Sequence, residues 1–476
     1  MEQQKPNVVL IFTDQWRGDC LEFLGHSVVE TPFLNEMASE GITFNSAYAA
    51  APSCIPARAC LATGQTPYTC GRLGYEDKVP WNYKNTMMEV LRNNGYQTMN
   101  VGKTHFYPQR VNLGFEINRL YDPQRLDEGF KSDYHIWLER MSNGKVKDTA
   151  VEWDNNSWVT FPWTGGDELH PTSWTAQMGK EVLEHRDPTR PFFLQLSFHR
   201  PHPPYDPPQY YFDMYKDKEL SELPIGNWAE EYGEKIEKTT SWKGKLTKEK
   251  CDRMKRGYYA SISHIDAQIG RFIHWLKGKG LYDNTYLIFL SDHGELLGDH
   301  YMYRKISPWE GSAKIPLIIK PPININCKRG VVEDFPTTHM DIMPTILEEL
   351  GISIPEKVEG VSLSPIIKGE NLIDRSYIHG EHTGYGKQGW QFVTDGKSKF
   401  IWDSYSGKEW YFDLTKDPSE ERNLIGVNEY DENISVWRKR LVDILALRPE
   451  HGLSDGTKLI SGKRLPNTIK KIANSK

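Results

Sequence analysis

The sequence predicts an α/β fold: a large, mostly parallel sheet flanked by helices, followed by a smaller C-terminal part with a short antiparallel sheet and a helix. Five short apolar runs alternate with segments of helical periodicity, which is typical of βαβ units. Four of these runs lead directly into ionisable residues, as in open α/β sheets, where ligands bind beyond the carboxyl ends of the strands. Near residue 370 the chain changes character and aromatic, hairpin-like segments begin.

The predicted strands of the large sheet are short runs rich in β-branched and aromatic residues. They are Val8–Phe12, Thr98–Val101, Phe192–Ser197, Tyr286–Leu290 and Ile315–Ile319. The segments between them that show helical spacing predict helices over Thr31–Glu40, Thr86–Asn94, Ser173–His185 and Glu249–Lys277. Two further segments, Arg110–Leu169 and Glu219–Lys248, are polar and weakly periodic, and we expect insertions or long loops there.

The C-terminal part reads as a small antiparallel sheet with one helix. Its strand signals are the aromatic segments 390–396, 399–402 and 410–413, and its helix is predicted from about Ile434 to Leu447. We therefore expect a catalytic domain over residues 1–370 and a C-terminal α+β subdomain over residues 371–476.

Composition narrows the classes of protein that the chain could represent. A net charge of −6 over 476 residues argues against a nucleic-acid partner, since such proteins carry a basic excess. No apolar stretch approaches the length of a membrane span, and residues 1–7 show no signal-peptide pattern, so we expect no membrane partner and a cytoplasmic location. The six cysteines show neither the density of a disulfide framework nor a Cys-x-x-Cys zinc pair.

Polar side chains follow four of the predicted strands. These are Asp14 after the first, Lys103 and His105 after the second, His199 and His202 after the third, and Asp292 with His293 after the fourth. Because the carboxyl ends of parallel strands meet at one edge of a sheet, we expect these residues to converge although they are distant in sequence.

The most informative motif is Cys54-Ile-Pro56-Ala-Arg58, followed by an apolar run and Thr63-Gly64. Pro56 suits the first turn of a helix, so we expect Cys54 at a helix start, where backbone N–H groups face a bound anion. The spacing Cys-x-Pro-x-Arg resembles the signature of the type I, formylglycine-dependent sulfatases of the alkaline phosphatase-like superfamily. The resemblance implies that a maturation enzyme oxidises Cys54 to formylglycine, whose hydrate attacks sulfur.

The resemblance covers most of the chain. It extends to Thr31–Asn35, Tyr259–Asp266, Tyr411–Pro418 and Asn423-Leu424. For a divalent metal it implies a site made of Asp14, Gln15, Cys54 in its modified form, Asp292 and His293. Oxygen-rich sets suit Ca²⁺, the ion usual in sulfatases, with Mg²⁺ or Mn²⁺ as alternatives. This chain departs from the commonest pattern, because many relatives carry a second Asp where Gln15 stands.

The same resemblance implies roles for five further catalytic side chains. Arg58 would spread charge on the sulfuryl oxygens, Lys103 would bind a sulfate oxygen and the nucleophile, and His105 would take a proton in the elimination step. His202 would contact the sulfate or the leaving oxygen, and Lys305 would protonate that oxygen.

Some neighbouring residues admit more than one role. Arg304 lies next to Lys305 and is an alternative for protonating the leaving oxygen. His199 and Arg200 fit a structural role as well as a catalytic one, and the stretch 295–300 is expected either to contribute to the site or to order its loop.

The function that these expectations describe is hydrolysis of a sulfate ester, of the arylsulfatase type or on a sulfated sugar. One alternative is a phosphonate or phosphate ester hydrolase of the same superfamily, because tetrahedral sulfuryl and phosphoryl groups look alike. Another is a non-catalytic binder of sulfated glycans, if Cys54 is never converted. We expect the alcohol portion of a small sulfated substrate to be recognised by residues of 110–174, 219–248 and 379–382.

Overall fold

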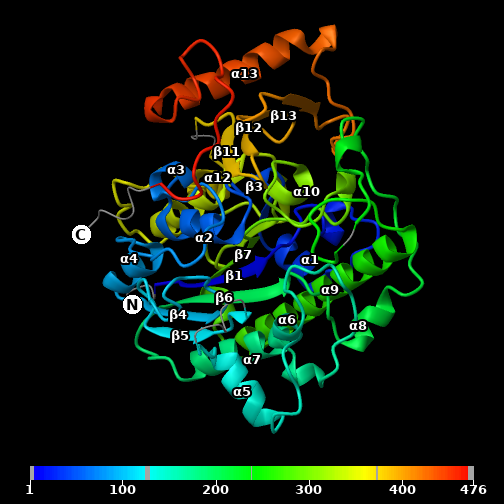
Figure 1. Ribbon diagram of the computed structural model, residues 1–476. Coiled ribbons are helices and arrows are strands. Elements are labelled where there is room, and N and C mark those ends of the chain that lie inside the picture. The colour runs from blue at the N-terminus through cyan, green and yellow to red at the C-terminus, as the bar shows by residue number, and fades with distance from the viewer. Residues whose placement is uncertain (1–4, 124–128, 237, 371–373, 470–476) are drawn as a thin grey trace.

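The computed structural model describes residues 5–123, 129–236, 238–370 and 374–469, and its centre is a large mixed sheet (Figure 1). The eight strands lie in the order β5-β4-β6-β1-β7-β8-β2-β9. Their bounds are β1 Asn7–Asp14, β2 Ile42–Phe44, β4 Gln97–Gly102, β5 Ile117–Leu120, β6 Phe192–Pro201, β7 Thr285–Ser291, β8 Leu317–Lys320 and β9 Val331–Glu333. A separate pair joins β3 Ala47–Tyr48 to β10 Thr337–Thr338.

The five strands from β5 to β7 are mutually parallel, which confirms the predicted sheet type. The strand β8 runs antiparallel to both of its neighbours. The reason lies in the connection: residues 292–316 stay at the carboxyl edge of the sheet instead of crossing back over a face, so the chain re-enters the sheet from the edge at which it left.

Helices cover both faces of this sheet (Figure 1). The alternating side chains of β1 show which helices pack on which face. Val9 and Ile11 pack with α1 Pro32–Ser39, α7 Pro171–Glu184 and α9 Lys248–Gly278. Val8, Leu10 and Phe12 pack on the other side with α2 Cys54–Thr63, α4 Met87–Asn93, α11 Ile342–Glu349 and α12 Ser364–Lys368. Because neighbouring side chains of a strand point to opposite faces, burial on both sides explains the continuous apolar runs in the sequence.

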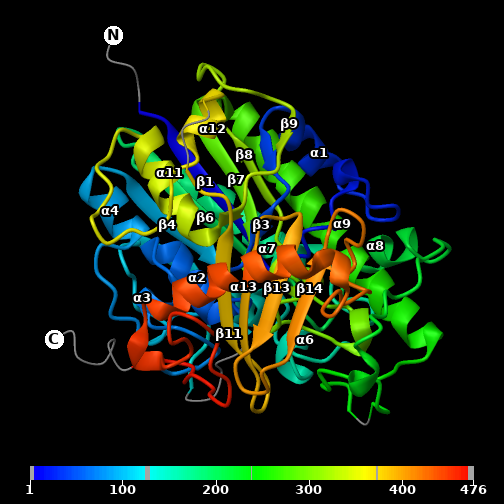
Figure 2. The ribbon, with the colours of Figure 1, turned by 90° about the horizontal axis from the view of Figure 1, so that it is seen from above.

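The C-terminal part is an antiparallel four-stranded sheet with one long helix across it (Figure 2). Its elements are β11 Ile378–Thr383, β12 Gly389–Thr394, β13 Ser398–Asp403, β14 Glu409–Asp413 and α13 Asp431–Ala446. Phe400 and Tyr411 pack against α13, while Phe392 and Trp410 point the other way and pack against Trp309 of the catalytic part. The residues 371–373, at the predicted domain boundary, lie outside the described residues, and the division into two domains stays a prediction.

One expectation about the connections was wrong. Residues 110–169 contain the edge strand β5 and the helices α5 Asp133–Met141 and α6 Thr149–Glu152. Their signals are weak because β5 has a single buried residue, Leu120, and α5 buries only Tyr134 and Leu138. The segment 219–248, by contrast, contains one 3-10 turn, Glu230–Tyr232, among its described residues, as the polar composition predicted.

The remaining short helices are α3 Pro67–Cys70, α8 Gln209–Met214 and α10 Glu310–Ala313. All six cysteines are free thiols. Among the described residues, no helix combines the length and the apolar character that crossing a bilayer requires.

Candidate active site

The carboxyl ends of four neighbouring strands bring the polar residues together. In the sheet β4 lies beside β6, β6 beside β1 and β1 beside β7, and Gly102 pairs with Ser197 as Thr13 pairs with Ser291. The next residues along the chain therefore emerge at one edge, where Asp14, Lys103 and Asp292 meet around the start of α2.

Cys54 is the first residue of α2, as the position of Pro56 predicted. Its Sγ lies 3.2 Å from His293 Nε2 and 3.7 Å from Asp14 Oδ1. One ligand atom from each of Asp14, Cys54, Asp292 and His293 lies within 4.8 Å of the others, and all four residues are buried. The structure therefore brings together four of the five residues expected to hold a metal.

Two cations compensate the two carboxylates of this cluster. The Arg58 Nη2 lies 3.3 Å from Asp14 Oδ2 and 3.1 Å from Asp292 Oδ2, and the Lys103 Nζ lies 2.6 Å from Asp14 Oδ2. Burial opposes the charge on Arg58 and on Lys103, but the carboxylates outweigh it and raise both pKa values. Burial likewise favours a neutral Asp14, yet Lys103, His202 and Arg58 hold its pKa well below the usual value. Arg58 Nη1 also donates to Lys103 O at 2.9 Å and to Ser197 Oγ at 3.3 Å.

The donor set fits a divalent cation. His293 Nδ1 donates to Gly294 O at 2.9 Å, which leaves Nε2 as an acceptor, and burial lowers the pKa of His293 to about 4, so the ring is neutral. That Nε2 faces Asp14 Oδ1 at 3.7 Å and Asp292 Oδ1 at 3.4 Å. Three acceptors that face one another repel unless a cation lies between them, and carboxylate oxygens with a neutral imidazole are suitable ligands for such an ion.

The surroundings of Cys54 keep its thiol protonated. Burial, and after it the charge of Asp14, raises the pKa of Cys54 to about 12. Because the thiolate is the nucleophilic form, an unmodified Cys54 is a poor nucleophile at neutral pH.

Gln15 and Lys305 lie together at the other side of the cluster. The Gln15 amide donates through Nε2 to Glu295, and its Oε1 accepts a hydrogen bond from Lys305 Nζ. The loop that carries Lys305 is held by Arg17, whose Nη1 donates to Glu295 O at 2.9 Å and to Asp299 Oδ2 at 2.7 Å. Glu295 and Asp299 therefore order this loop, which was one of the two roles expected for them. Gln15 as a metal ligand stays a prediction.

Besides His293, three more of the histidines expected near the site are buried, each in a different setting. His202 Nδ1 donates to Pro203 O at 3.0 Å, and burial, followed by Lys305, lowers its pKa well below 6.5. His105 follows β4 two residues after Lys103, with its ring centroid 5.8 Å from that of Tyr75. His199 lies within β6, hydrogen-bonded to Arg200, which in turn binds Asp206.

One contact next to Cys54 was not predicted from the sequence. His382, on β11, accepts a hydrogen bond at Nε2 from Ser53 Oγ at 2.6 Å, because its Nδ1 donates to Thr383 O. Ser53 is the residue before Cys54, and its side chain makes no helix-capping bond. His382 belongs to the stretch 379–382 that we expected to read the alcohol. No spacing signal connects it to Ser53, 329 residues away.

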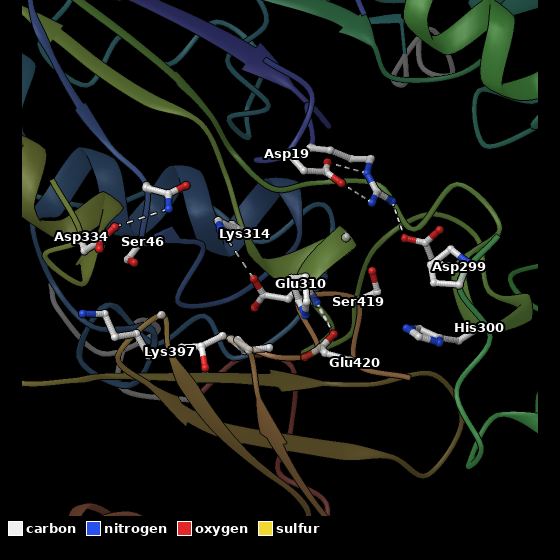
Figure 3. A pocket seen from close by; sticks show the side chains of 18 residues that line it. Asp19, Ser46, Asp299, His300, Glu310, Lys314, Asp334, Lys397, Ser419 and Glu420 are labelled. Atoms are coloured by element: carbon white, nitrogen blue, oxygen red, sulfur yellow. Dashed lines mark hydrogen bonds and ion pairs between the residues drawn. The ribbon is translucent and has the colours of Figure 1, made fainter. Parts of the chain in front are cut away.

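A cavity of about 480 Å³ lies beside the Lys305 loop and the C-terminal sheet, and none of the expected catalytic or metal residues lines it (Figure 3). Several of the charged residues that line it form ion pairs within the protein. Arg17 binds Asp299, and Glu310 and Glu420 share Lys399 at 2.9 Å and 3.0 Å. The Glu310–Lys399 pair joins the connection between β7 and β8 to the C-terminal sheet, so the cavity lies where these two parts of the structure meet.

Comparison with known proteins agrees with this geometry. A family model described as Sulfatase matches residues 6–352, and a second, described as N-sulphoglucosamine sulphohydrolase, C-terminal, matches residues 298–446. An arylsulfatase of Clostridium perfringens is 45% identical over 482 residues, covering 98% of this chain and 100% of the relative.

Solved structures share the fold. A phosphonate monoester hydrolase of Agrobacterium radiobacter has a TM-score of 0.79 at 24% identity, covering 94% of this chain and 96% of that one. A putative sulfatase from Bacteroides fragilis has a TM-score of 0.70 at 25% identity, covering 94% and 96%. With the family model spanning well over half of its length, the chain belongs to the sulfatase family of the alkaline phosphatase-like superfamily, as the Cys54 motif predicted.

Proposed function

We propose that this protein hydrolyses sulfate esters, of the arylsulfatase type or on a sulfated sugar, with residue 54 as the nucleophile after conversion to formylglycine. The observation that carries the proposal is the buried cluster of Cys54, Asp14, Asp292 and His293 at the start of α2. The 45% identity to a protein named arylsulfatase supports the aryl sulfate as first substrate.

The chemistry of residue 54 motivates the conversion. A thiol with a pKa of about 12 does not supply a nucleophile near neutral pH. When converted, this residue provides a hydrated aldehyde as covalent nucleophile, and a formylglycine-generating maturation enzyme is the partner that the conversion requires.

For the metal we propose one divalent ion, Ca²⁺ first and Mg²⁺ or Mn²⁺ as alternatives, held by Asp14, Asp292, His293 and residue 54, with Gln15 as a fifth candidate. Bound there, the ion would act as a Lewis acid toward a sulfuryl oxygen. Gln15 contributes no negative charge, and its Oε1 lies against Lys305, so the ion depends mainly on the two carboxylates.

Three cationic side chains of this protein are proposed to stabilise the negative charge that develops during the reaction. Arg58 is fixed by two carboxylates, Lys103 O and Ser197, so its guanidinium needs no reorganisation when negative charge grows beside residue 54. Lys103 and Lys305 approach the cluster from opposite loops, as partners for the sulfate and the leaving oxygen. His202 is proposed to contact the sulfate or the leaving oxygen that Lys305 protonates, and His105 to take a proton in the elimination step.

The test combines modification with turnover. Tryptic mass spectrometry of the Cys54 peptide from the native source should show the loss of sulfur and gain of oxygen expected of formylglycine. The same preparation should release sulfate from an aryl sulfate faster than it cleaves a phenylphosphonate monoester, while Cys54→Ala folds normally and is inactive. Faster cleavage of the phosphonate would favour the phosphonate hydrolase instead, and normal turnover by Cys54→Ala would end the formylglycine mechanism. The cytoplasmic location stays a prediction from the sequence.

A further inference from the structure

The loop that carries Lys305 also presents Arg304, which the mechanism above does not use. The backbone is held on both sides of this pair: Arg304 N donates to Glu295 Oε1, and Ile306 N donates to Pro52 O at 2.9 Å, two residues before Cys54. Arg304 and Ile306 both have left-handed backbone angles, with φ of 71° and 74°. Such angles are costly outside glycine and persist where surrounding contacts impose them.

The Arg304 side chain lacks the partners that a guanidinium normally has. Its Nε and Nη2 atoms are buried, and within the described part of the chain neither has a hydrogen-bond partner. No carboxylate of the described residues forms a salt bridge with it, whereas Arg58, close by, contacts two. A buried donor without a partner costs about 1–3 kcal/mol, and more when it is charged, so in a native protein such a group calls for a partner that a water, an ion or a ligand supplies.

The surroundings of Arg304 show what kind of ligand would meet it. Tyr385, in the loop between β11 and β12, has its hydroxyl within hydrogen-bonding reach of Arg304. Burial raises the pKa of Tyr385, and the neighbouring Arg304 guanidinium opposes this shift. The Tyr385 ring stacks on Trp242, with centroids 4.7 Å apart and planes at 17°. The Trp242 carbonyl accepts from Tyr303 N at 2.9 Å, which ties this segment to the Lys305 loop.

We propose that Arg304, with the Trp242–Tyr385 stack, forms the subsite for the alcohol portion of the substrate, and that it selects alcohols bearing a second oxyanion, a carboxylate or another sulfate. This inference rests on the proposed sulfatase function and adds the substrate class. The planar guanidinium matches the two oxygens of such a group, and the stacked rings give the ring of the alcohol a flat surface to pack on. In this arrangement Lys305 binds the scissile sulfate, and Arg304 binds the second anion.

The experiment uses a matched pair of substrates: carboxyphenyl sulfate and carbamoylphenyl sulfate, in both the meta and the para isomers. The two groups are nearly isosteric, but the ionised carboxylate withdraws electrons less than the carbamoyl group. This intrinsic difference is the same in every variant, so the change in the ratio of the two kcat/KM values between wild type and variant reports recognition of the charge. In the wild type the carboxylate ester is preferred in at least one isomer. The Arg304→Gln substitution lowers that ratio by about 10- to 100-fold, the range for a hydrogen bond to a charged group. Arg304→Lys keeps the positive charge but loses the planar, two-donor geometry of the guanidinium, and it gives a kcat/KM ratio between those of wild type and Arg304→Gln. A phenylene bis-sulfate identifies whether sulfate replaces carboxylate.

The control variant is Lys243→Gln, which removes a partly exposed cation beside Trp242 that pairs with Glu234. It measures the general effect of charge in this region, and the selectivity ratio should stay within about twofold of wild type, since a surface ion pair contributes little. The inference is overturned if Arg304→Gln also keeps the ratio of kcat/KM values within twofold of wild type. This must hold for the meta and para carboxylate esters and for the bis-sulfate, each compared with the carbamoyl ester.

A binding measurement separates this inference from the proposed function. Calorimetric titration of the same esters into Cys54→Ala protein, with and without Arg304→Gln, reads the subsite without turnover. Tighter binding of the carboxylate ester that disappears with Arg304→Gln supports the subsite even if the wild type releases no sulfate, in which case the proposed function fails alone. Equal affinities for the carboxylate and carbamoyl esters refute the subsite even in an active sulfatase.

Discussion

Replacing Arg58 by methionine tests whether charge balance holds the metal cluster together. Without a metal the cluster contains two carboxylates, Asp14 and Asp292, and two cations, Arg58 and Lys103, so its formal charge is zero. Methionine keeps much of the side-chain volume but leaves one buried carboxylate charge uncompensated. Removing one partner of a buried ion pair costs about 3–5 kcal/mol.

The expected shift in melting temperature follows from the size of the chain. At about 2.1 cal/mol/K of unfolding entropy per residue, the 476 residues correspond to about 1 kcal/mol/K, so Arg58→Met melts about 3–5 °C below wild type in the presence of a chelator. Differential scanning calorimetry measures this directly. Turnover of an aryl sulfate is lost in the same variant, because the guanidinium beside residue 54 is gone.

Calcium should restore part of that stability. Even at a dielectric constant of about 80, a unit charge about 5 Å from a dication costs about 1.7 kcal/mol, more than a tenfold change in affinity. Arg58→Met should therefore bind Ca²⁺ more tightly than wild type, and Ca²⁺ should raise its melting temperature more. Arg375→Met is the control, because Arg375 makes a bidentate pair with the buried Asp341 outside the cluster. A melting temperature for Arg58→Met within 1 °C of wild type in chelator, or equal rescue of Arg375→Met by Ca²⁺, would refute the reasoning.

Three further predictions address other parts of the structure. Lys103→Ala and His105→Ala should each lower kcat/KM by at least about 100-fold in an aryl sulfate assay; wild-type kinetics for both would mean that the site is misplaced. His382→Ala and Ser53→Ala should lower kcat with little change in KM, and their double-mutant cycle should show about 1–2 kcal/mol of coupling, since His382 holds the side chain of Ser53, the residue before Cys54. Additive effects would contradict that role. Burial raises the pKa of Asp266 to about 7, so the folded state binds a proton that the unfolded state has lost, and stability falls as pH rises from about 4 to 7. Between pH 5 and 8, the free energy of unfolding measured with urea should therefore fall by about 2–3 kcal/mol less for Asp266→Asn than for the wild type. Equal decreases in the two proteins would exclude the raised pKa.

The fold was largely readable because burial on both faces leaves a strong local signal. Strands such as β1 and β6 are continuous apolar runs, and helices such as α9 carry long apolar stripes, so both were predicted close to their bounds. The short strand β5 escaped because its residues are mostly half-exposed. The reversed direction of β8 escaped because it follows from the path of the preceding connection and not from its own residues.

The residues of the site that stand in short sequence motifs could be predicted, whereas the contacts between distant segments could not. The primary structure alone identified the Cys54 motif, the family and the strand-end residues Asp14, Lys103, Asp292 and His293, because each stands in a short motif whose spacing reflects its own backbone. Only folding revealed that His382 binds Ser53 and that Arg304 lies beside Tyr385 with its Nε and Nη2 atoms unpartnered among the described residues. Ser53 and His382 are 329 residues apart in the sequence, and Arg304 and Tyr385 belong to separate segments of the fold. Such contacts depend on how the two sheets pack against each other, which leaves no periodic trace along the chain.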